Sequence, residues 1–336
     1  MEKFRWCFIG VGNLAKMVAT QLNKSGRHEV VSCYARRIEK SREFAEKFGG
    51  TAYESVESAI LDPKVDAVYI VTPHNAHYRY ARLALELGKP VFCEKAFTVT
   101  AEETDQLISL AKEKNLYLCE AMWTWFAKTP NMVKTWIDER KIGTIKSANF
   151  TYHMKTTGRG DRHTDPRRAG GALLDITIYP ITYAYRLWGA PERIEASGKI
   201  VGGVDFSDEI TLKYRDFDVQ ISASINDFRG LENMKIKGEK GEISAFMYHC
   251  TDGATMKIGG KKEKYKSGGP LFFSYVEEFD AVASDIRAGR TESDLVPLKA
   301  HAQAKAPSQG SMLQRRMGNS PIYVLQRIQM KHQHEL

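Results

Sequence analysis

Short apolar runs alternate with longer amphipathic segments along the first 121 residues. The apolar runs, which predict buried strands, fall at residues 6–9, 29–35, 51–53, 65–71, 90–94 and 117–121. Segments with helical spacing lie between them, beginning at residue 13 and continuing at 39–48, 55–61, 77–87 and 100–114. Strands and helices in regular alternation predict an α/β fold built on a doubly wound parallel sheet.

The pattern changes after residue 121. Helical spacing recurs at 131–141, 172–188 and 274–288, and several strands of alternating character lie between residues 192 and 248. Turn signals such as Gly202-Gly203 separate these strands, which is typical of a mostly antiparallel sheet. We therefore expect a first domain over residues 1–121, an α+β domain with an open sheet over 122–299, and an atypical basic tail over 300–336.

Composition limits the class of protein. The chain of 336 residues is 43% hydrophobic and 27% charged, as in soluble globular proteins. No apolar stretch approaches the roughly 18 residues that span a bilayer, and the first residues show no signal peptide. Four cysteines fall in expected strands and Cys250 lies far from them, so we expect buried thiols in a reducing compartment. These features predict a cytoplasmic protein without a membrane partner.

The charge pattern argues against nucleic acid as a partner. The net charge is +8, but the basic residues are scattered, and no recognition helix or stacking module accompanies them. The segment from residue 300 to 336 has five basic side chains and one acid, and so supplies four of the eight charges.

A glycine-rich turn joins the first strand to the first helix. Gly10 and Gly12 are followed by Asn13, Leu14 and the small Ala15. The first glycine permits a tight turn, the second lets backbone amides approach a pyrophosphate, and the third position must be small for helix–strand packing. Together with the helix N-terminus, this pattern predicts a dinucleotide-binding (Rossmann) domain.

The end of the second strand indicates which dinucleotide. An acidic residue for the ribose 2'-hydroxyl is expected about 20 residues after the glycines, but the chain has Arg36 and Arg37 there. A guanidinium fits a 2'-phosphate by charge and bidentate geometry, so NADP(H) is predicted over NAD(H). The alternative is that both arginines open a solvated helix face.

Polar residues follow three later strands, at the edge where doubly wound sheets bind ligands. Residues 72–77 read Thr-Pro-His-Asn-Ala-His, residues 94–96 Glu-Lys-Ala, and residues 120–123 Glu-Ala-Met-Trp. Lys95 beside a bound cofactor could hold a reacting oxygen by a charge-assisted hydrogen bond. The alternative is a surface lysine paired with Glu94.

In the second domain, Gly170-Gly171 precedes a predicted helix that carries Asp175 and Tyr179 four residues apart. On one helix face, a carboxylate and a phenol make an acid–base pair, and a nearby lysine would stabilise tyrosinate. A capped helix with a core tyrosine is the alternative.

These motifs occur in one order: Gly10-x-Gly12-x-x-Ala15, Thr72-Pro73-His74-Asn75-x-His77, Glu94-Lys95-Ala96, Glu120-Ala121-Met122-Trp123, and Gly170-Gly171 through Asp175 to Tyr179. Over about residues 4–299 the chain thus resembles the glucose–fructose oxidoreductase, inositol dehydrogenase and rhizopine-catabolism (Gfo/Idh/MocA) family. The likeness is greatest to the branch of dimeric dihydrodiol dehydrogenases and NADP-linked D-xylose dehydrogenases.

The resemblance implies an NAD(P)-dependent dehydrogenase acting on CH–OH groups, with Lys95 beside the nicotinamide and Asp175 and Tyr179 completing the site. Cofactor contacts are implied for the glycine turn, the arginines, Thr72, Pro73, His74, His77, Glu94 and Lys95. It further implies that His77 lines the nicotinamide pocket, and that a homodimer forms through the open face of the second-domain sheet.

Several residues depart from the family pattern. Ala96 replaces a proline, and Trp125 stands where the branch has an arginine. Trp123 is expected to stack on a substrate ring, and the aromatic stretch of Trp123, Trp125 and Phe126 to alter substrate contacts. The alternative for this stretch is a domain-interface core. Beyond Lys299, prolines and glycines interrupt the chain where relatives end in an acidic amphipathic helix, which indicates a frameshifted or replaced terminus.

The expected reaction is reversible hydride transfer between NADP and a secondary or hemiacetal alcohol of a neutral sugar, polyol or trans-dihydrodiol. His74 and His77 have no third ligand at a useful spacing, so no metal is expected. A redox-cycling NAD-dependent glycosidase and a non-catalytic dinucleotide-binding regulator are the alternatives. The regulator would lack the lysine and the acid, whereas the glycosidase would retain its cofactor through purification.

Overall fold

A computed structural model of the chain describes residues 2–156, 162–228, 231–268 and 275–298. The tail expected over 300–336 lies outside the described residues. The chain forms two compact units, the first comprising described residues 2–126 and 275–298, and the second the remaining described residues. The last helix, which the expected boundaries assign to the second domain, therefore belongs to the first unit.

The first unit contains a six-stranded parallel sheet of order β3-β2-β1-β4-β5-β6, which confirms the predicted Rossmann fold. Its strands are β1 (Phe4–Ile9), β2 (His28–Tyr34), β3 (Thr51–Ala52), β4 (Ala67–Ile70), β5 (Val91–Glu94) and β6 (Leu118–Ala121). Its α-helices are α1 (Asn13–Ser25), α2 (Ile38–Phe48), α3 (Val56–Ile60), α4 (His77–Glu86), α5 (Ala101–Lys114) and α8 (Val276–Arg287). Short 3-10 helices follow β4 and β6, namely η1 (His74–Ala76) and η2 (Trp123–Trp125).

An aromatic cluster explains why α8 packs in the first unit. Phe279 is fully buried, and its ring lies 4.8 Å from Trp6, 4.9 Å from Tyr69 and 5.1 Å from Phe92. Burying a phenylalanine side chain stabilises a fold by about 1.5–3 kcal/mol. The hydrophobic face of α8 packs on the parallel sheet of the first unit. The spacing of apolar residues in α8 predicts that it has a buried face, but not which sheet covers that face.

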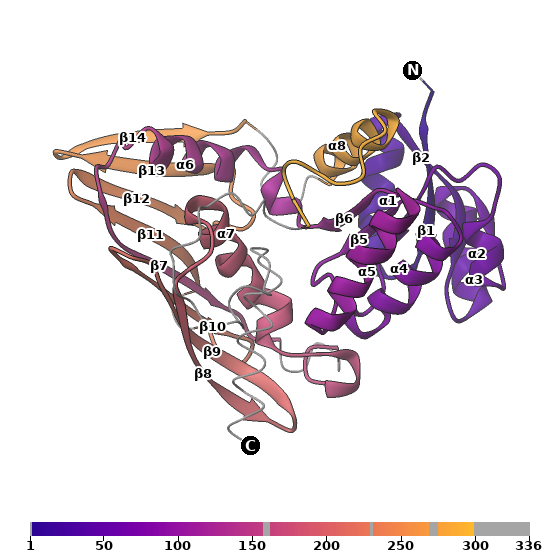
Figure 1. Ribbon diagram of the computed structural model, residues 1–336, viewed down its shortest axis with the longest axis horizontal. Coiled ribbons are helices and arrows are strands. Elements are labelled where there is room, and N and C mark those ends of the chain that lie inside the picture. Colours follow the sequence, from indigo (N-terminus) through magenta and orange to yellow (C-terminus); the bar gives the residue numbers. More distant parts are fainter. Residues whose placement is uncertain (1, 157–161, 229–230, 269–274, 299–336) are drawn as a thin grey trace. The chain divides into compact units, whose positions relative to one another are not determined.

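The second unit contains an eight-stranded sheet of order β14-β13-β12-β11-β7-β10-β9-β8, as expected mostly antiparallel. Only the β7–β10 pair among its described strands is parallel. The strands are β7 (Ile145–His153), β8 (Arg193–Val201), β9 (Val204–Lys213), β10 (Asp218–Ser224), β11 (Glu232–Gly238), β12 (Gly241–Phe246), β13 (Gly253–Ile258) and β14 (Lys261–Lys266). Helices α6 (Lys128–Asp138) and α7 (Ile178–Trp188) lie against one face of this sheet, as Figure 1 shows.

The helix expected over 172–188 is not uniform. A π-helical turn, η4 (Leu173–Thr177), precedes α7, and the 3-10 helix η3 (Pro166–Arg168) lies just upstream. π-turns are rare and are found mostly at functional sites. The turn contains Asp175, one of the expected site residues, so the spacing from Asp175 to Tyr179 is not that of a regular α-helix.

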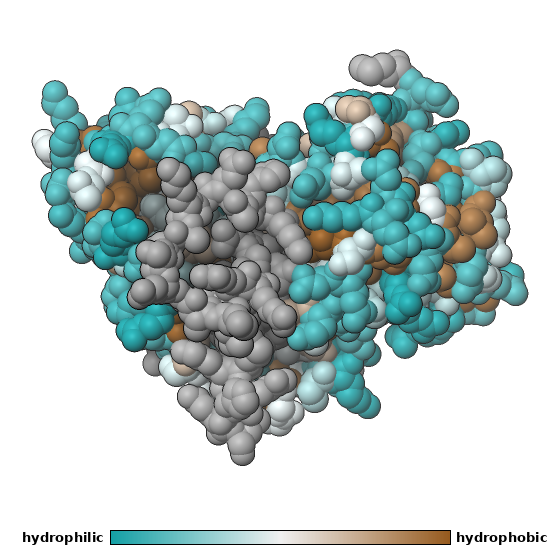
Figure 2. All heavy atoms as spheres, in the orientation of Figure 1, coloured by the Kyte–Doolittle hydropathy of each residue, from teal (hydrophilic) through white to brown (hydrophobic). Residues whose placement is uncertain are grey.

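The surface and the cysteines agree with the composition. Hydrophilic residues cover most of the described face in Figure 2, and hydrophobic side chains show between them in small groups. All five cysteines are buried free thiols, as expected. Within the described ranges, none of the helices has the length and apolar character needed to cross a membrane.

Candidate active site

The glycine turn of the first unit is built so that only glycine fits at its first position. Gly10 has φ +102°, and a Cβ there would lie 2.5 Å from the carbonyl oxygen of Val71 at the end of β4. Its amide donates to the carbonyl of Tyr34 at the end of β2, at 2.9 Å. The turn is therefore tied to the carboxyl ends of both strands that flank β1.

The N-terminus of α1 remains open for an anion. Gly12 is the N-cap residue, with no side chain to bond the first amides, and the first turn contains no acidic residue. A Cβ on Gly12 would meet nothing within 4 Å, and Asn13 is exposed. Ala15 is completely buried, as close packing of α1 on the sheet requires. Free helical amides beside an uncovered glycine fit a pyrophosphate group.

Arg36 and Arg37 lie just after β2, separated from it by Ala35, and both are exposed. Arg37 is the residue before the first turn of α2. Their side chains extend from the strand end where the ribose of a bound dinucleotide is recognised in Rossmann folds. The sequence expectation of a 2'-phosphate contact is thus compatible with their place and exposure.

Lys95 lies immediately after β5, half-buried, in a segment that is anchored on both sides. The Lys95–Ala96 peptide bond is cis. Before the lysine, the Glu94 carboxylate accepts a hydrogen bond of 2.5 Å from the Tyr69 hydroxyl. After it, the amide of Phe97 donates to Glu120 Oε1 at 3.0 Å. These buried contacts fix the backbone from which the lysine side chain extends.

His77 also anchors this segment. It is completely buried, with Nδ1 2.8 Å from the carbonyl oxygen of Ala96 and Nε2 2.8 Å from that of Thr72. Burial lowers the pKa of His77, and a neutral imidazole donates to only one of these two carbonyls. His77, which the resemblance places in the nicotinamide pocket, therefore connects the loop after β4 to the segment that contains Lys95.

Glu120 lies beside the Lys95 segment, and the sequence assigned it no role. Its side chain at the end of β6 is 3% exposed, and burial raises its pKa from 4.5 to about 7, while Lys95 acts in the opposite direction. A charged residue in an otherwise apolar strand was the available signal. What the pattern could not show is that this carboxylate bonds the backbone two residues after Lys95.

The aromatic residues after β6 are mostly enclosed. Trp123, at the start of η2, is 6% exposed, and its ring lies 6.4 Å from that of Tyr275 in the same unit. Trp125 is equally buried. Burial of both rings fits the alternative core role as well as a substrate contact.

In the second unit, the absence of side chains at the two glycines before η4 lets other groups pack closely against the backbone. A Cβ on Gly170 would lie 2.7 Å from the carbonyl oxygen of His163, and one on Gly171 would lie 1.9 Å from Asp205 Oδ1. Asp205 uses this space to accept a hydrogen bond of 2.6 Å from the amide of Leu173, which caps the first turn. Burial raises the pKa of Asp205 to about 6. The glycine pair therefore positions the turn that carries Asp175.

Asp175 is 8% exposed and binds two basic side chains. Arg162 Nη2 lies 3.0 Å from its Oδ1, and His163 Nδ1 lies 2.9 Å from its Oδ2. Because Gly170 lets the backbone of residues 162 and 163 pass closely, these partners reach the carboxylate. Tyr179 is 7% exposed in the first turn of α7.

The structure thus groups the expected residues into two sets. The glycine turn, the arginines, residues 72–77 and 94–95, and Trp123 belong to the first unit, whereas Asp175 and Tyr179 belong to the second. The first set offers an anion cradle and an anchored ammonium group. The second offers a carboxylate with basic partners and a phenol. The first set can bind a dinucleotide, and the second contains groups that can exchange a proton with an alcohol.

Comparisons with known proteins agree with this chemistry. Residues 4–121 match the oxidoreductase family with an NAD-binding Rossmann fold, and residues 131–244 match the GFO/IDH/MocA C-terminal domain. A trans-1,2-dihydrobenzene-1,2-diol dehydrogenase from Sus scrofa is 30% identical over 285 residues, or 82% of each chain. D-xylose 1-dehydrogenase (NADP(+)) from Hypocrea jecorina is 29% identical, covering 81% of this chain and 80% of that protein.

Solved structures share the fold. A 3-ketoreductase from Actinomadura kijaniata in complex with NADP and TDP-benzene aligns with a TM-score of 0.77 at 24% identity, over 86% of this chain and 91% of that one. Levoglucosan dehydrogenase in complex with NADH and levoglucosan aligns with a TM-score of 0.77 at 21% identity, over 87% and 92%. With both domains matched, the chain belongs to the Gfo/Idh/MocA family of NAD(P)-binding oxidoreductases.

Proposed function

We propose that this protein transfers a hydride between NADP(H) and a secondary or hemiacetal alcohol of a neutral polyhydroxylated substrate. The observation that carries the proposal is the anchored lysine segment. Hydrogen bonds from Tyr69 to Glu94 and from Phe97 to Glu120 hold Lys95 at the carboxyl end of β5. That sheet edge is where Rossmann folds bind the dinucleotide.

Each site residue then has a chemical task. Bound NADP supplies the hydride acceptor for alcohol oxidation. The Tyr179 phenolate takes the hydroxyl proton, and the Lys95 ammonium favours the phenolate and holds the reacting oxygen. Asp175 orients Lys95 or a substrate hydroxyl, while its contacts with Arg162 and His163 keep the carboxylate in place. In the reverse direction Tyr179 returns the proton to the carbonyl oxygen.

Exposure and charge support NADP as the preferred cofactor. The exposed Arg36 and Arg37 can form charge-assisted hydrogen bonds with a 2'-phosphate, and no acidic residue stands at that strand end for a 2'-hydroxyl. Among the relatives, the D-xylose dehydrogenase is named for NADP. Cys7 and the other buried thiols agree with a cytoplasmic location.

The substrate class rests on the relatives and on the polar groups of Asp175 and Tyr179. The named relatives act on a sugar and on a dihydrodiol. Asp175 and Tyr179 can bond vicinal hydroxyl groups of either, and Trp123 would stack on the carbon face of a ring.

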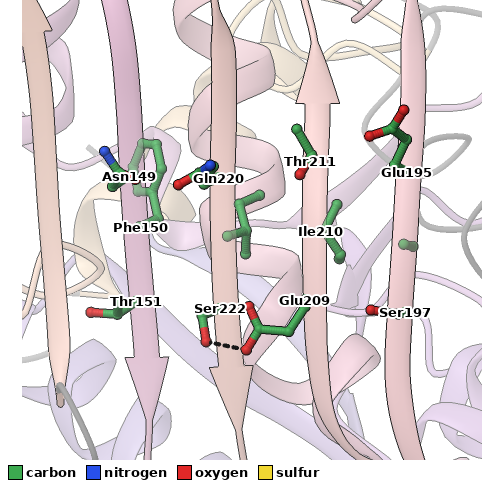
Figure 3. Close-up of a pocket in the computed structure, with 12 residues that line it drawn as sticks. Asn149, Phe150, Thr151, Glu195, Ser197, Glu209, Ile210, Thr211, Gln220 and Ser222 are labelled. Carbon is green, nitrogen blue, oxygen red and sulfur yellow. Dashed lines mark hydrogen bonds between the residues drawn. The ribbon is translucent and has the colours of Figure 1, made fainter.

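We also propose a homodimer through the open sheet face of the second unit. Figure 3 shows this face over β7 to β10, where Asn149, Thr151, Gln220 and Ser222 alternate with inward apolar residues. Ser222 on β10 donates a hydrogen bond of 2.6 Å to Glu209 on the neighbouring strand β9. The Gln220→Arg change would place a charge on this face, and light scattering after size exclusion should show a monomer if the proposal holds. A dimer that persists would remove this face from consideration.

The function is tested by NADPH absorbance at 340 nm with D-xylose, D-glucose, myo-inositol and a cyclic trans-diol, for wild type, Tyr179→Phe and Tyr183→Phe. Tyr183 is a matched control, because it lies one helical turn away and its buried hydroxyl has no hydrogen-bond partner in the described structure. The proposal predicts turnover that Tyr179→Phe lowers by about 10²–10⁴-fold and Tyr183→Phe leaves nearly unchanged. Equal loss in both variants, or none in either, would contradict it.

A further inference from the structure

Two aromatic rings pack against Tyr179 inside the second unit. The ring of His249, from the segment after β12, lies 5.0 Å from that of Tyr179, and the ring of Tyr152, from β7, lies 6.1 Å from it. The His249 and Tyr152 rings stack on each other at 4.9 Å. The orientation of the proposed acid–base phenol therefore depends on a histidine that the sequence motifs do not include.

A buried carboxylate fixes the orientation of His249. Glu232 is 4% exposed, and its two oxygens accept hydrogen bonds from the same residue. Oε1 lies 2.6 Å from the amide nitrogen of His249, and Oε2 lies 2.5 Å from its Nδ1. Because a carboxylate can only accept, the proton resides on Nδ1, which leaves Nε2 as an acceptor in the neutral ring. Nε2 lies 3.3 Å from the Tyr152 hydroxyl, whose proton can complete the chain.

The backbone takes up unfavourable conformations on both sides of this pair. Leu231, just before Glu232, has φ +45°, and Met247, two residues before His249, has φ +49°. Bulky side chains rarely occupy this region. The amide of Met247 donates to the carbonyl of Glu232 at 2.9 Å, which brings the following turn back over the start of β11. Such strain persists where surrounding contacts over-determine it, and it clusters at active sites.

Titratable groups face His249 from each element that packs on it. Glu232 faces it from β11, Tyr152 from β7, Tyr179 from α7, and Cys250 follows it in the chain. The ligand atoms of Glu232, His249 and Cys250 lie within 4.8 Å of one another, as in a metal site. Glu232 and His249 already bond each other, however, and burial raises the pKa of Cys250 to about 12, so this group is a neutral thiol near pH 7. The cluster is best described as a histidine held by a carboxylate.

We propose that His249 is a positioning residue for Tyr179, held in one tautomer by Glu232, and that the negative charge of Glu232 tunes proton transfer at the Tyr179 phenol. The proposal rests on the proposed function, because it assigns Tyr179 the proton-transfer role. Glu232 bonds the ring that packs on Tyr179, and its negative charge there opposes formation of the phenolate. Removing the charge while keeping the shape should therefore ease ionisation of Tyr179 but loosen its orientation.

The test compares Glu232→Gln and His249→Gln with Tyr248→Phe. Tyr248 is a matched control from the same segment, because its fully buried hydroxyl has no partner in the described structure and its ring contacts Phe150 and Tyr183 instead. Far-UV circular dichroism confirms that each variant folds. We expect kcat to fall about 10- to 100-fold in both glutamine variants with KM changed less than about threefold, as misplacement of a reacting group predicts. Tyr248→Phe should match wild type.

The pH profile separates charge from packing. In Glu232→Gln the limb of the kcat profile that reports Tyr179 ionisation should move to lower pH, a shift that a merely structural role would not produce. Nitrogen-15 NMR of histidine-labelled wild type should show His249 protonated at Nδ1, with the signal assigned by its absence in His249→Gln. A signal from the Nε2-protonated form would overturn the proposal without any turnover measurement.

The outcomes also separate this inference from the proposed function. If Tyr179→Phe abolishes turnover but both glutamine variants keep the wild-type kcat and pH profile, the role of His249 is refuted and the proposed function stands. If wild type itself turns over none of the alcohols, the proposed function fails, and the role of His249 fails with it.

Discussion

Replacing Glu120 by glutamine should change how the stability of this protein depends on pH. The carboxyl is 3% exposed and accepts one backbone hydrogen bond, from the Phe97 amide. Burial raises its pKa from 4.5 to about 7. Between these two values the unfolded chain has released the proton and the folded chain retains it. The free energy of unfolding contributed by this group is therefore complete below pH 4.5 and is lost as the pH rises through 7.

The magnitude follows from the difference between the two pKa values. Each pH unit in that interval is worth about 1.4 kcal/mol, so ionisation of Glu120 should lower the free energy of unfolding by roughly 3 kcal/mol between pH 4.5 and 7.5. Glutamine has the same shape, can still accept the Phe97 hydrogen bond, and does not titrate. Relative to wild type, Glu120→Gln should therefore gain roughly 3 kcal/mol over this range.

Urea unfolding followed by circular dichroism and tryptophan fluorescence, at pH steps from 4.5 to 7.5, measures this difference. Other titrating groups, including Asp205 and His77, are the same in both proteins and cancel in the difference. Glu113→Gln, an exposed position on α5, provides the matched control and should give a flat difference curve. A flat curve for Glu120→Gln as well would refute the conclusion that this carboxyl is protonated in the folded protein near pH 6.

Three further changes test the glycine turn, the arginines after β2 and the turn that contains Asp175. Gly12→Ala should leave the urea midpoint unchanged, because the new Cβ clashes with nothing in the protein. It should weaken dinucleotide binding at least about tenfold, measured by fluorescence titration, because this Cβ lies where the anion approaches. The double variant Arg36→Ala, Arg37→Ala should raise KM for NADP about 10- to 100-fold and leave KM for NAD nearly unchanged. An equal rise in KM for both cofactors would place the arginines away from the 2'-phosphate. Gly171→Ala should lower the free energy of unfolding by more than about 1 kcal/mol, because its Cβ would lie 1.9 Å from Asp205 Oδ1. An unchanged urea midpoint would show that the hydrogen bond from the Leu173 amide to Asp205 is dispensable.

Local patterns predicted much of this fold. Alternation of apolar runs and amphipathic segments predicted the parallel sheet, because each buried strand and each amphipathic helix has its own period. Thr100 and Glu103 form the capping box that begins α5, a signal contained within four residues. The glycine turn was recognisable for the same reason, since Gly10 and Gly12 act on their immediate neighbours.

Other features depend on contacts between residues far apart in the chain. Phe279 packs against Trp6, which places α8 in the first unit, and nothing in the spacing of α8 identifies that partner. The roles of Glu120 and His77 likewise follow from which backbone groups their buried side chains bond. The π-turn at Asp175 could not be predicted from periodicity, because a single wide turn leaves the apolar pattern nearly unchanged.

The role of Lys95 in hydride transfer is measured by comparing Lys95→Ala with wild type, with cofactor binding and NADPH formation followed on the same samples. Lys95 extends from a segment that Glu94, Glu120 and His77 anchor, so its removal should leave the fold and dinucleotide binding largely intact. Lys95→Ala should still bind NADP but form NADPH at least about 10²-fold more slowly than wild type with the best alcohol of the panel. Wild-type turnover in the variant, with the cofactor bound, would contradict the assignment of Lys95 to the reacting centre.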